Sequence, residues 1–207
     1  MITVYQKSFN PPKIDKREIL RYAGAGCESS ELEELLSSLL SEAQDKLIYK
    51  TCYTFFPVKN LGACLDLGFA TVNSKALQKN LSGCDEIMLF AATVGTGIDR
   101  LIKKYGALSP TKQLLLQAIG SERVEALCDA LCESIAEELS SSMRTLRPRF
   151  SAGYGDLPLE LQREIFSVLD CPRRIGLTLN DNLLMSPSKS VTAIVGIYKS
   201  GSNQQNG

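Results

Sequence analysis

The longest regular pattern in the sequence is helical and runs from Ser109 to Leu139. Ser109 is a suitable N-cap, and Pro110 takes the first helical position, where a missing N–H costs no hydrogen bond. Apolar side chains then recur at intervals of three and four residues, which predicts one buried face; they are Val124, Leu127, Cys128, Leu131, Cys132, Ile135 and Leu139. Gly120 is expected to break or kink this helix. Such a long helix argues against the short alternating units of a doubly wound parallel fold.

Short β-prone segments surround this helix in the sequence. They predict strands at Ile2–Gln6, Leu47–Val58, Ala63–Val72, Glu86–Val94 and Ser190–Tyr198. The second and third segments flank an Asn-Leu-Gly turn and are expected to form a hairpin. Caps and amphipathic spacing predict shorter helices after Asp15, after Ser29 or Ser30, at Ser74–Asn80 and at Leu159–Leu169. The sequence therefore predicts one α+β domain over residues 1–198 and a disordered polar tail over 199–207.

Composition argues against several classes of function. Lysine plus arginine equals aspartate plus glutamate, 23 against 23, so the chain has no net basic charge for binding nucleic acid. It contains no histidine, which excludes Ser-His and Cys-His nucleophiles and histidine metal sites. No segment has the roughly 20 apolar residues of a membrane span, and the start of the chain is too polar for a signal peptide. We expect a cytoplasmic protein with reduced cysteines, in which Cys128 and Cys132 are buried.

The segment Gly95–Gly106 has the strand, Gly-x-Gly and helix order of a dinucleotide fingerprint. Arg100 takes the place of the third glycine, and no second strand follows directly. We prefer to interpret it as a tight strand-to-helix turn, with Asp99 in the first helical turn, where the helix dipole favours a carboxylate. Phosphate binding is the alternative.

Two charged features follow each other after the middle of the chain. The long helix carries an acidic stripe, which is most often a solvated face; its residues are Glu122, Glu125, Asp129, Glu133 and Glu137. The next loop, Arg147–Pro158, has the sequence RPRFSAGYGDLP, which is a poor helix and a poor strand. Arg149 has a fork of donors that suits a carboxylate. The loop is either an ordinary connector or one side of a site for a small zwitterion.

The loop and its flanks resemble the activation (reactivation) domain of cobalamin-dependent methionine synthase, which binds S-adenosylmethionine (AdoMet). RFSAGYGDLP fits the pattern R-x-x-x-G-Y-x-x-x-P, and ERVEALCDALCESI is similar to the long helix that precedes it in that family. NDNLLMSPSKSVTAIVGIY resembles the closing segment of the family, with matching positions at Met185, Pro187, Ser190 and Val191. The resemblance extends over residues 120–198.

The resemblance implies a mostly antiparallel twisted sheet flanked by long helices, and an AdoMet site at Arg149, Glu125, Ser151, Gly153 and Tyr154. Arg149 would clamp the ligand carboxylate, and Glu125 would accept a hydrogen bond from the ligand. Gly153 would let the backbone approach, and Tyr154 would face the adenosyl group or the corrin of cobalamin. Neither a catalytic side chain nor a metal ligand is expected, because such a domain only has to position the methyl group of AdoMet against the cobalt.

By the same resemblance, the chain would be a stand-alone reactivation subunit that supports reductive methylation of cob(II)alamin to methylcobalamin. Its partners would be a cobalamin-binding methionine synthase subunit or another corrinoid protein, and a flavodoxin- or ferredoxin-type electron donor. The aspartate that contacts AdoMet near the start of the family's domain has only Asp15, or less well Asp66, as a counterpart.

This departure keeps an alternative open: a non-catalytic assembly or activation factor for another corrinoid methyltransferase. An independent AdoMet-dependent methyltransferase is a weaker interpretation, because the usual glycine-rich loop between a first strand and helix is missing.

Overall fold

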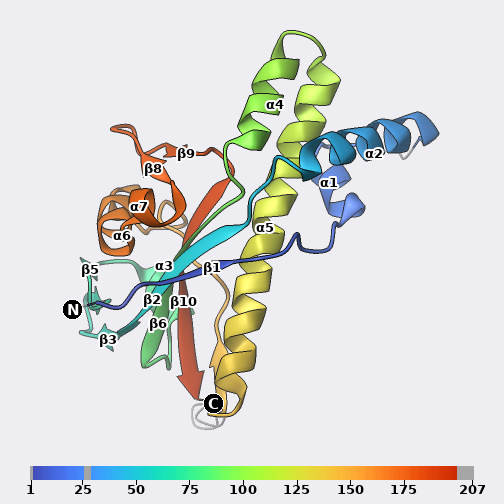
Figure 1. Ribbon diagram of the computed structural model, residues 1–207. Helices are drawn as coiled ribbons and strands as arrows, with labels where there is room; N and C mark the ends of the chain where they lie inside the picture. Colours follow the sequence, from blue (N-terminus) through green and yellow to red (C-terminus); the bar gives the residue numbers. More distant parts are fainter. Residues whose placement is uncertain (1, 26–28, 200–207) are drawn as a thin grey trace.

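The computed structural model describes residues 2–25 and 29–199, and a five-stranded sheet forms its centre (Figure 1). The strands lie in the order β1-β2-β6-β10-β7, and every neighbouring pair is antiparallel. Their bounds are Tyr5–Ser8 for β1, Lys50–Pro57 for β2, Glu86–Thr93 for β6, Ser190–Lys199 for β10 and Arg144–Leu146 for β7. The predicted α+β class with a mostly antiparallel sheet is confirmed.

Strand β6 lies in the middle of the sheet and is buried along almost its whole length. Met88 and Phe90 belong to one hydrophobic core, whereas Ile87 and Leu89 belong to a second core. Because side chains alternate along a strand, these two cores lie on opposite faces of the sheet. The continuously apolar sequence of β6 therefore requires a covering layer on each face.

Four helices cover the first face of the sheet, and α5 is the longest of them (Figure 1). Their bounds are Lys16–Tyr22 for α1, Ser30–Gln44 for α2, Gly97–Gly106 for α4 and Pro110–Ser140 for α5. Helix α5 packs against the other three helices and against the sheet. In Figure 1 it runs along the whole molecule. Among the residues that the structure describes, no helix has the length and apolarity needed to cross a membrane.

Shorter elements cover the second face. The helical ones are α3 at Lys75–Asn80, a 3-10 turn at Leu159–Leu161, α6 at Gln162–Leu169 and α7 at Cys171–Ile175. Two small sheets complete this side, one of β3 (Lys59–Asn60), β4 (Leu65–Asp66) and β5 (Thr71–Val72), the other of β8 (Thr178–Leu179) and β9 (Met185–Ser186). The cap predicted at Asp15 is present, the cap predicted at Ser29 or Ser30 is Ser29, and Ser74, the predicted start of a helix, caps α3.

The predicted hairpin between residues 47–58 and 63–72 is wrong. Strand β2 pairs with β1 on one side and β6 on the other, which leaves it no free edge. The third predicted strand is divided into β4 and β5 by a turn at Gly68, whose φ is +77°. The N–H of Gly68 donates to the carboxylate of Asp66 at 2.9 Å, which stabilises this turn.

Two further expectations need correction. Gly120 does not interrupt α5, which is continuous from Pro110 to Ser140. A Cβ at this position would meet Lys189 Cγ at 2.8 Å and Ile98 Cγ1 at 3.1 Å. The glycine lets these neighbours approach the helix closely. Lys199, predicted to belong to the tail, is the last residue of β10, and residues 200–207 lie outside the described residues.

The segment after β6 is the tight strand-to-helix turn that the sequence favours. A Cβ on Gly97 would lie 1.9 Å from the carbonyl oxygen of Lys46, so the backbone of the α2–β2 connection occupies the space in front of this glycine. Asp99, in the first turn of α4, accepts hydrogen bonds from the N–H and hydroxyl of Ser188. This contact joins α4 to the segment before β10.

Candidate functional site

Arg149 bridges two carboxylates of α5. Its Nη2 donates to Glu125 Oε2 at 2.7 Å, and its Nη1 donates to Asp129 Oδ1 at 2.5 Å. The two acids are four residues apart and so lie on the same side of the helix. Burial opposes the charge of Arg149, but the hydrogen bond to Asp129 and the nearby negative charges, including those of Asp129 and Glu125, together outweigh it and raise the pKa of the guanidinium. The structure thus brings together Arg149 and Glu125, two of the predicted ligand contacts.

The backbone after Arg149 is fixed to the sheet and then turns sharply. Phe150 exchanges two hydrogen bonds with Ile194 of β10, at 2.9 and 2.8 Å. Gly153 has φ +85°, a left-handed conformation that favours glycine. Its N–H donates to the carbonyl of Leu157 at 2.9 Å, which closes the turn. The glycine that the sequence singled out therefore shapes the loop.

Tyr154 is one of the exposed predicted contacts. The residue is 69% exposed, and its ring packs edge-on against the ring of Phe150, with the ring centroids 5.3 Å apart. Its N–H donates to the carbonyl of Ser151 at 3.1 Å. Neither Ser151, Gly153 nor Tyr154 lines the cleft described below. Tyr154 packs on Phe150, which belongs to the core of the second face, whereas the Arg149 side chain reaches α5 on the first face.

Asp156 is a structural residue of this loop that sequence reasoning missed. The hydroxyl of Ser74 donates to Asp156 Oδ1 at 2.5 Å, and the N–H groups of Lys75 and Ala76 donate to the same carboxylate at 2.7 and 3.2 Å. The hydrogen bond from Ser74 and those from the backbone lower the pKa of Asp156. A carboxylate at the first turn of α3 is the type of group that a helix start favours, but its partner lies 82 residues away, so no local pattern reveals the contact.

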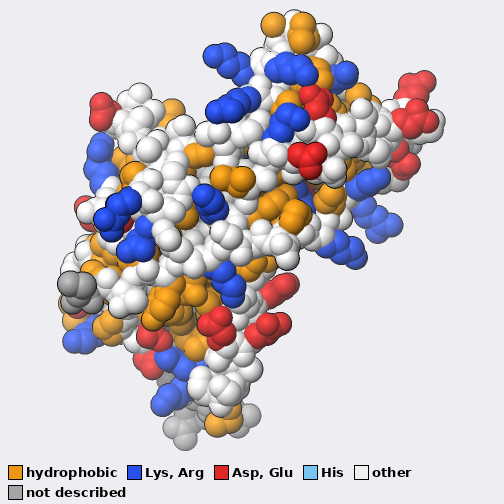
Figure 2. Space-filling model, in the orientation of Figure 1, with side chains coloured by type: hydrophobic (Ala, Val, Ile, Leu, Met, Phe, Trp, Pro, Cys, Tyr) orange, Lys and Arg blue, Asp and Glu red, His pale blue; other side chains and the backbone are white. Residues whose placement is uncertain are grey.

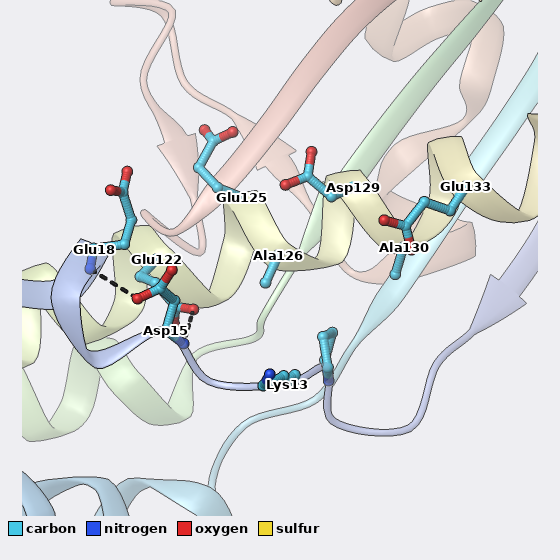
Figure 3. A pocket seen from close by; sticks show the side chains of 10 residues that line it. Lys13, Asp15, Glu18, Glu122, Glu125, Ala126, Asp129, Ala130 and Glu133 are labelled. Atoms are coloured by element: carbon cyan, nitrogen blue, oxygen red, sulfur yellow. Dashed lines mark hydrogen bonds between the residues drawn. The ribbon is translucent and has the colours of Figure 1, made fainter.

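An acidic cleft of about 400 Å³ lies between α5 and the segment that leads into α1 (Figure 3). This volume is within the range of roughly 300–1,000 Å³ that is usual for small-molecule sites. The N-terminal segment and helix α5 both contribute to its lining, which consists of Pro12, Lys13, Asp15, Glu18, Glu122, Glu125, Ala126, Asp129, Ala130 and Glu133. Figure 3 shows Glu125 and Asp129 projecting from the same side of α5. Six carboxylates and one lysine line the cleft, and arginines outside this lining pair with four of the carboxylates: Arg21 with Glu18, Arg123 with Glu122, and Arg149 with Glu125 and Asp129.

A buried ion pair holds the N-terminal wall of the acidic cleft in place. Arg123 donates to the carbonyl oxygens of Pro12 and Lys13 at 2.6 and 2.8 Å, and it also binds the carboxylate of Glu122. Glu122 Oε1 in turn accepts the N–H of Asp15 at 3.0 Å. Glu122 was predicted to lie on a solvated stripe, but it is 3% exposed because this pairing draws it inward. In the sequence, only the neighbouring Arg123 indicates that Glu122 could be paired and buried.

The two aspartates considered as counterparts of the family's N-terminal aspartate lie in different places. Asp15 lines the acidic cleft, but its carboxylate accepts the N–H groups of Arg17 and Glu18 at 3.0 and 3.1 Å and so caps α1. Asp66 lies in β4, in the group of elements that covers the second face. The structure therefore places only Asp15 near Glu125.

The closing segment reaches α5 one helical turn before Glu125. Lys189 Nζ donates to Ser121 Oγ at 3.0 Å. Ser190, one of the matched positions, donates its hydroxyl to the carbonyl of Pro187 at 2.8 Å and lies 2.8 Å from the hydroxyl of Thr93. The arginine loop and the closing segment thus approach neighbouring parts of α5 although they are distant in sequence.

Residues 74–204 match the family described as vitamin B12 dependent methionine synthase, activation domain. The chain belongs to this family. The fold agrees with that of a solved relative, the MetH reactivation domain bound to AdoHcy, with a TM-score of 0.68 and 16% sequence identity. That alignment covers 100% of this chain and 81% of the relative. No curated protein matches the chain.

Family membership covers the parts of the activation domain that carry the arginine loop, the second half of α5 and the closing segment. The N-terminal elements β1, α1 and α2 lie outside the matched residues. The shared fold nevertheless extends over the whole chain. The acidic cleft is therefore built from a matched wall on α5 and an unmatched wall at residues 12–18.

Proposed function

We propose that this activation domain is a reactivation subunit of a cobalamin-dependent methionine synthase. It would bind AdoMet and support the reductive methylation of cob(II)alamin to methylcobalamin on a cobalamin-binding partner. The observation that supports this most directly is the arrangement of Arg149 with Glu125 and Asp129 at an acidic cleft of about 400 Å³. The solved relative is bound to AdoHcy, the product that AdoMet becomes when it gives up its methyl group.

The donor set of the site fits the charges of AdoMet. The ligand has one carboxylate, one ammonium and a sulfonium, so it needs one cation and several anions or acceptors. Arg149 would hold the carboxylate by exchanging one of its two bonds to α5 for a bond to the ligand. Glu125 and the neighbouring acids of the cleft would attract the ammonium and sulfonium.

The rest of the loop would serve the approach of the partner. Gly153 keeps the backbone free of a side chain at the turn, and Tyr154 presents an exposed ring that packs edge-on against Phe150. We propose that this ring faces the adenosyl group or the corrin. Cobalamin, carried by the partner, would supply the cobalt that accepts the methyl group. The chain itself holds AdoMet and excludes water, which is positioning and not acid-base chemistry.

The cellular setting belongs to the same proposal. A one-electron donor of the flavodoxin or ferredoxin type would reduce the cobalt, and the protein would act in the cytoplasm in methionine biosynthesis. We propose no nucleic-acid or membrane partner. The chain would contribute to a methyltransferase as an accessory subunit and would not be catalytic alone.

Titration calorimetry with AdoMet tests the site assignment. Arg149→Ala should weaken AdoMet binding at least about tenfold, because it removes a charge-assisted hydrogen bond to the ligand carboxylate. Arg163→Ala is the matched control, since this exposed arginine lies on the other face and, among the described residues, donates only to the carbonyl of Asp181. Equal AdoMet affinity in the wild type and Arg149→Ala would refute the assignment.

One observation favours the alternative, a non-catalytic assembly or activation factor for another corrinoid methyltransferase. Arg149 already satisfies two carboxylates, and the Asp15 carboxylate is engaged in capping α1. Both groups would have to exchange existing bonds for ligand bonds. Tight binding to a corrinoid protein that AdoMet neither strengthens nor weakens would support this alternative.

A further inference from the structure

A small basic pocket lies between β1, β2 and α7, on the side of the sheet opposite α5. Its volume is about 170 Å³, and its lining consists of Gln6, Lys7, Ser8, Lys50, Thr51, Arg174 and Ile175. The lining contains three cationic residues and no carboxylate. Figure 2 shows Lys and Arg side chains gathered over the region of α7 in the left part of the view. This basic pocket differs in charge from the acidic cleft and shares no lining residue with it.

The strand register decides which side chains face α7. Cys52 of β2 belongs to the second core together with Cys171 and Ile175 of α7. Lys50 is two residues from Cys52, so it lies on the same face of the strand. Ser8 is the cross-strand partner of Lys50 and shares this face.

Lys7 does not contribute its charge to this face. Its side chain turns to α5, where Nζ donates to the hydroxyl of Ser134 and lies 3.6 Å from Glu138. The backbone of Lys7 accepts the hydroxyl of Thr51 at 3.1 Å. The positive charge of the basic pocket therefore comes from Lys50 and Arg174.

Arg174 is held in place but is incompletely satisfied. Its Nη1 donates to the carbonyl of Val4 at 3.1 Å, while its Nε is buried and has no acceptor among the residues that the structure describes. Within residues 2–25 and 29–199, no carboxylate lies within 4.0 Å of Arg174 or Lys50. The adjacent Arg173, in contrast, pairs with Asp170 at 2.7 Å. Arg174 therefore lines the pocket without a carboxylate to balance its charge.

We propose that the basic pocket binds a phosphate-type oxyanion, either as the free ion or as the phosphate end of a larger molecule. The guanidinium of Arg174 and the ammonium of Lys50 supply the charges, and both groups suit phosphate oxygens. Gln6 and Ser8 supply neutral donors. The anion would join β1, an edge strand, to α7, so binding stabilises the contact between these two elements.

The test is a titration of the full chain with inorganic phosphate, followed by amide NMR spectra against sodium chloride of equal ionic strength. We expect saturable shifts at Ser8, Lys50 and Ile175 that chloride does not reproduce. Arg174→Gln and Lys50→Gln should each weaken binding about tenfold or more, because each removes a charge-assisted contact. Arg173→Gln is the matched control and should bind phosphate as the wild type does.

Titrations with two ligands separate the two sources of phosphate. Tighter binding of a simple phosphomonoester than of inorganic phosphate would identify the end of a larger molecule, and the reverse order would identify the free ion. Lys50 is exposed and has no ion pair among the described residues, so Lys50→Gln tests the pocket even if Arg174→Gln is poorly folded. Shifts that do not saturate, or equal affinity in Lys50→Gln and the wild type, would overturn the proposal.

Discussion

Replacing Arg123 with glutamine should cause a large loss of stability. The side chains of Arg123 and Glu122 are only 2% and 4% exposed. The change removes the donors to the carbonyls of Pro12 and Lys13 and leaves the Glu122 carboxylate buried without its cation. Removing one partner of a buried pair typically costs about 3–5 kcal/mol. We expect the free energy of unfolding to fall by about this amount, out of the ~5–15 kcal/mol that is usual for a domain.

Urea unfolding followed by circular dichroism measures this loss. Arg100→Gln is the control, because this arginine is exposed on α4, and its free energy of unfolding should change by no more than about 0.5 kcal/mol. Adding Glu122→Gln to Arg123→Gln should recover part of the loss, since no unpaired charge then remains buried. A loss below about 1 kcal/mol in Arg123→Gln would refute the reasoning.

Three further predictions concern single positions. The hydrogen bond from Ser74 lowers the pKa of Asp156, so its stabilisation is present above the unfolded pKa and is lost as the pH falls through the folded pKa. Asp156→Asn should therefore lower the melting temperature at neutral pH, and melting curves should show the difference from the wild type shrinking near pH 3. Gly97→Ala should cost about 1–3 kcal/mol in urea unfolding, because its Cβ meets the carbonyl of Lys46; an unchanged midpoint would contradict the close approach. Burial raises the pKa of Cys128 well above its usual range, so maleimide should label Cys128 only after unfolding. Peptide mapping distinguishes Cys128 from the partly buried cysteines, and rapid labelling of Cys128 itself in the native protein would contradict its burial.

Local patterns were enough to predict the fold class and most elements. The apolar run of residues 86–94 predicted β6, and the spacing of apolar residues in 109–139 predicted α5. Cap residues such as Ser29 were recognisable because capping uses neighbours within three residues. The predicted burial is confirmed for Cys128, whereas Cys132 is only partly buried.

Contacts between distant segments were not predictable in the same way. The false hairpin arose because a turn signal says nothing about the strands that compete for an edge, here β1 and β6 on either side of β2. The burial of Glu122 depends on its pairing with Arg123 and on the backbone of residues 12–15, which is more than 100 residues away in the sequence. The sequence singled out Arg149 and Glu125, but the cleft wall at residues 12–18 became visible only in three dimensions.

The central claim is tested most directly by cobalt chemistry on a purified corrinoid partner. The partner is loaded with cob(II)alamin, and a one-electron reductant, AdoMet and this chain are added, with absorbance spectra recorded over time. We predict conversion to methylcobalamin that requires both AdoMet and this chain and is slower with Arg149→Ala than with Arg163→Ala. Conversion at the same rate without this chain, or none in the complete mixture, would contradict the proposed role.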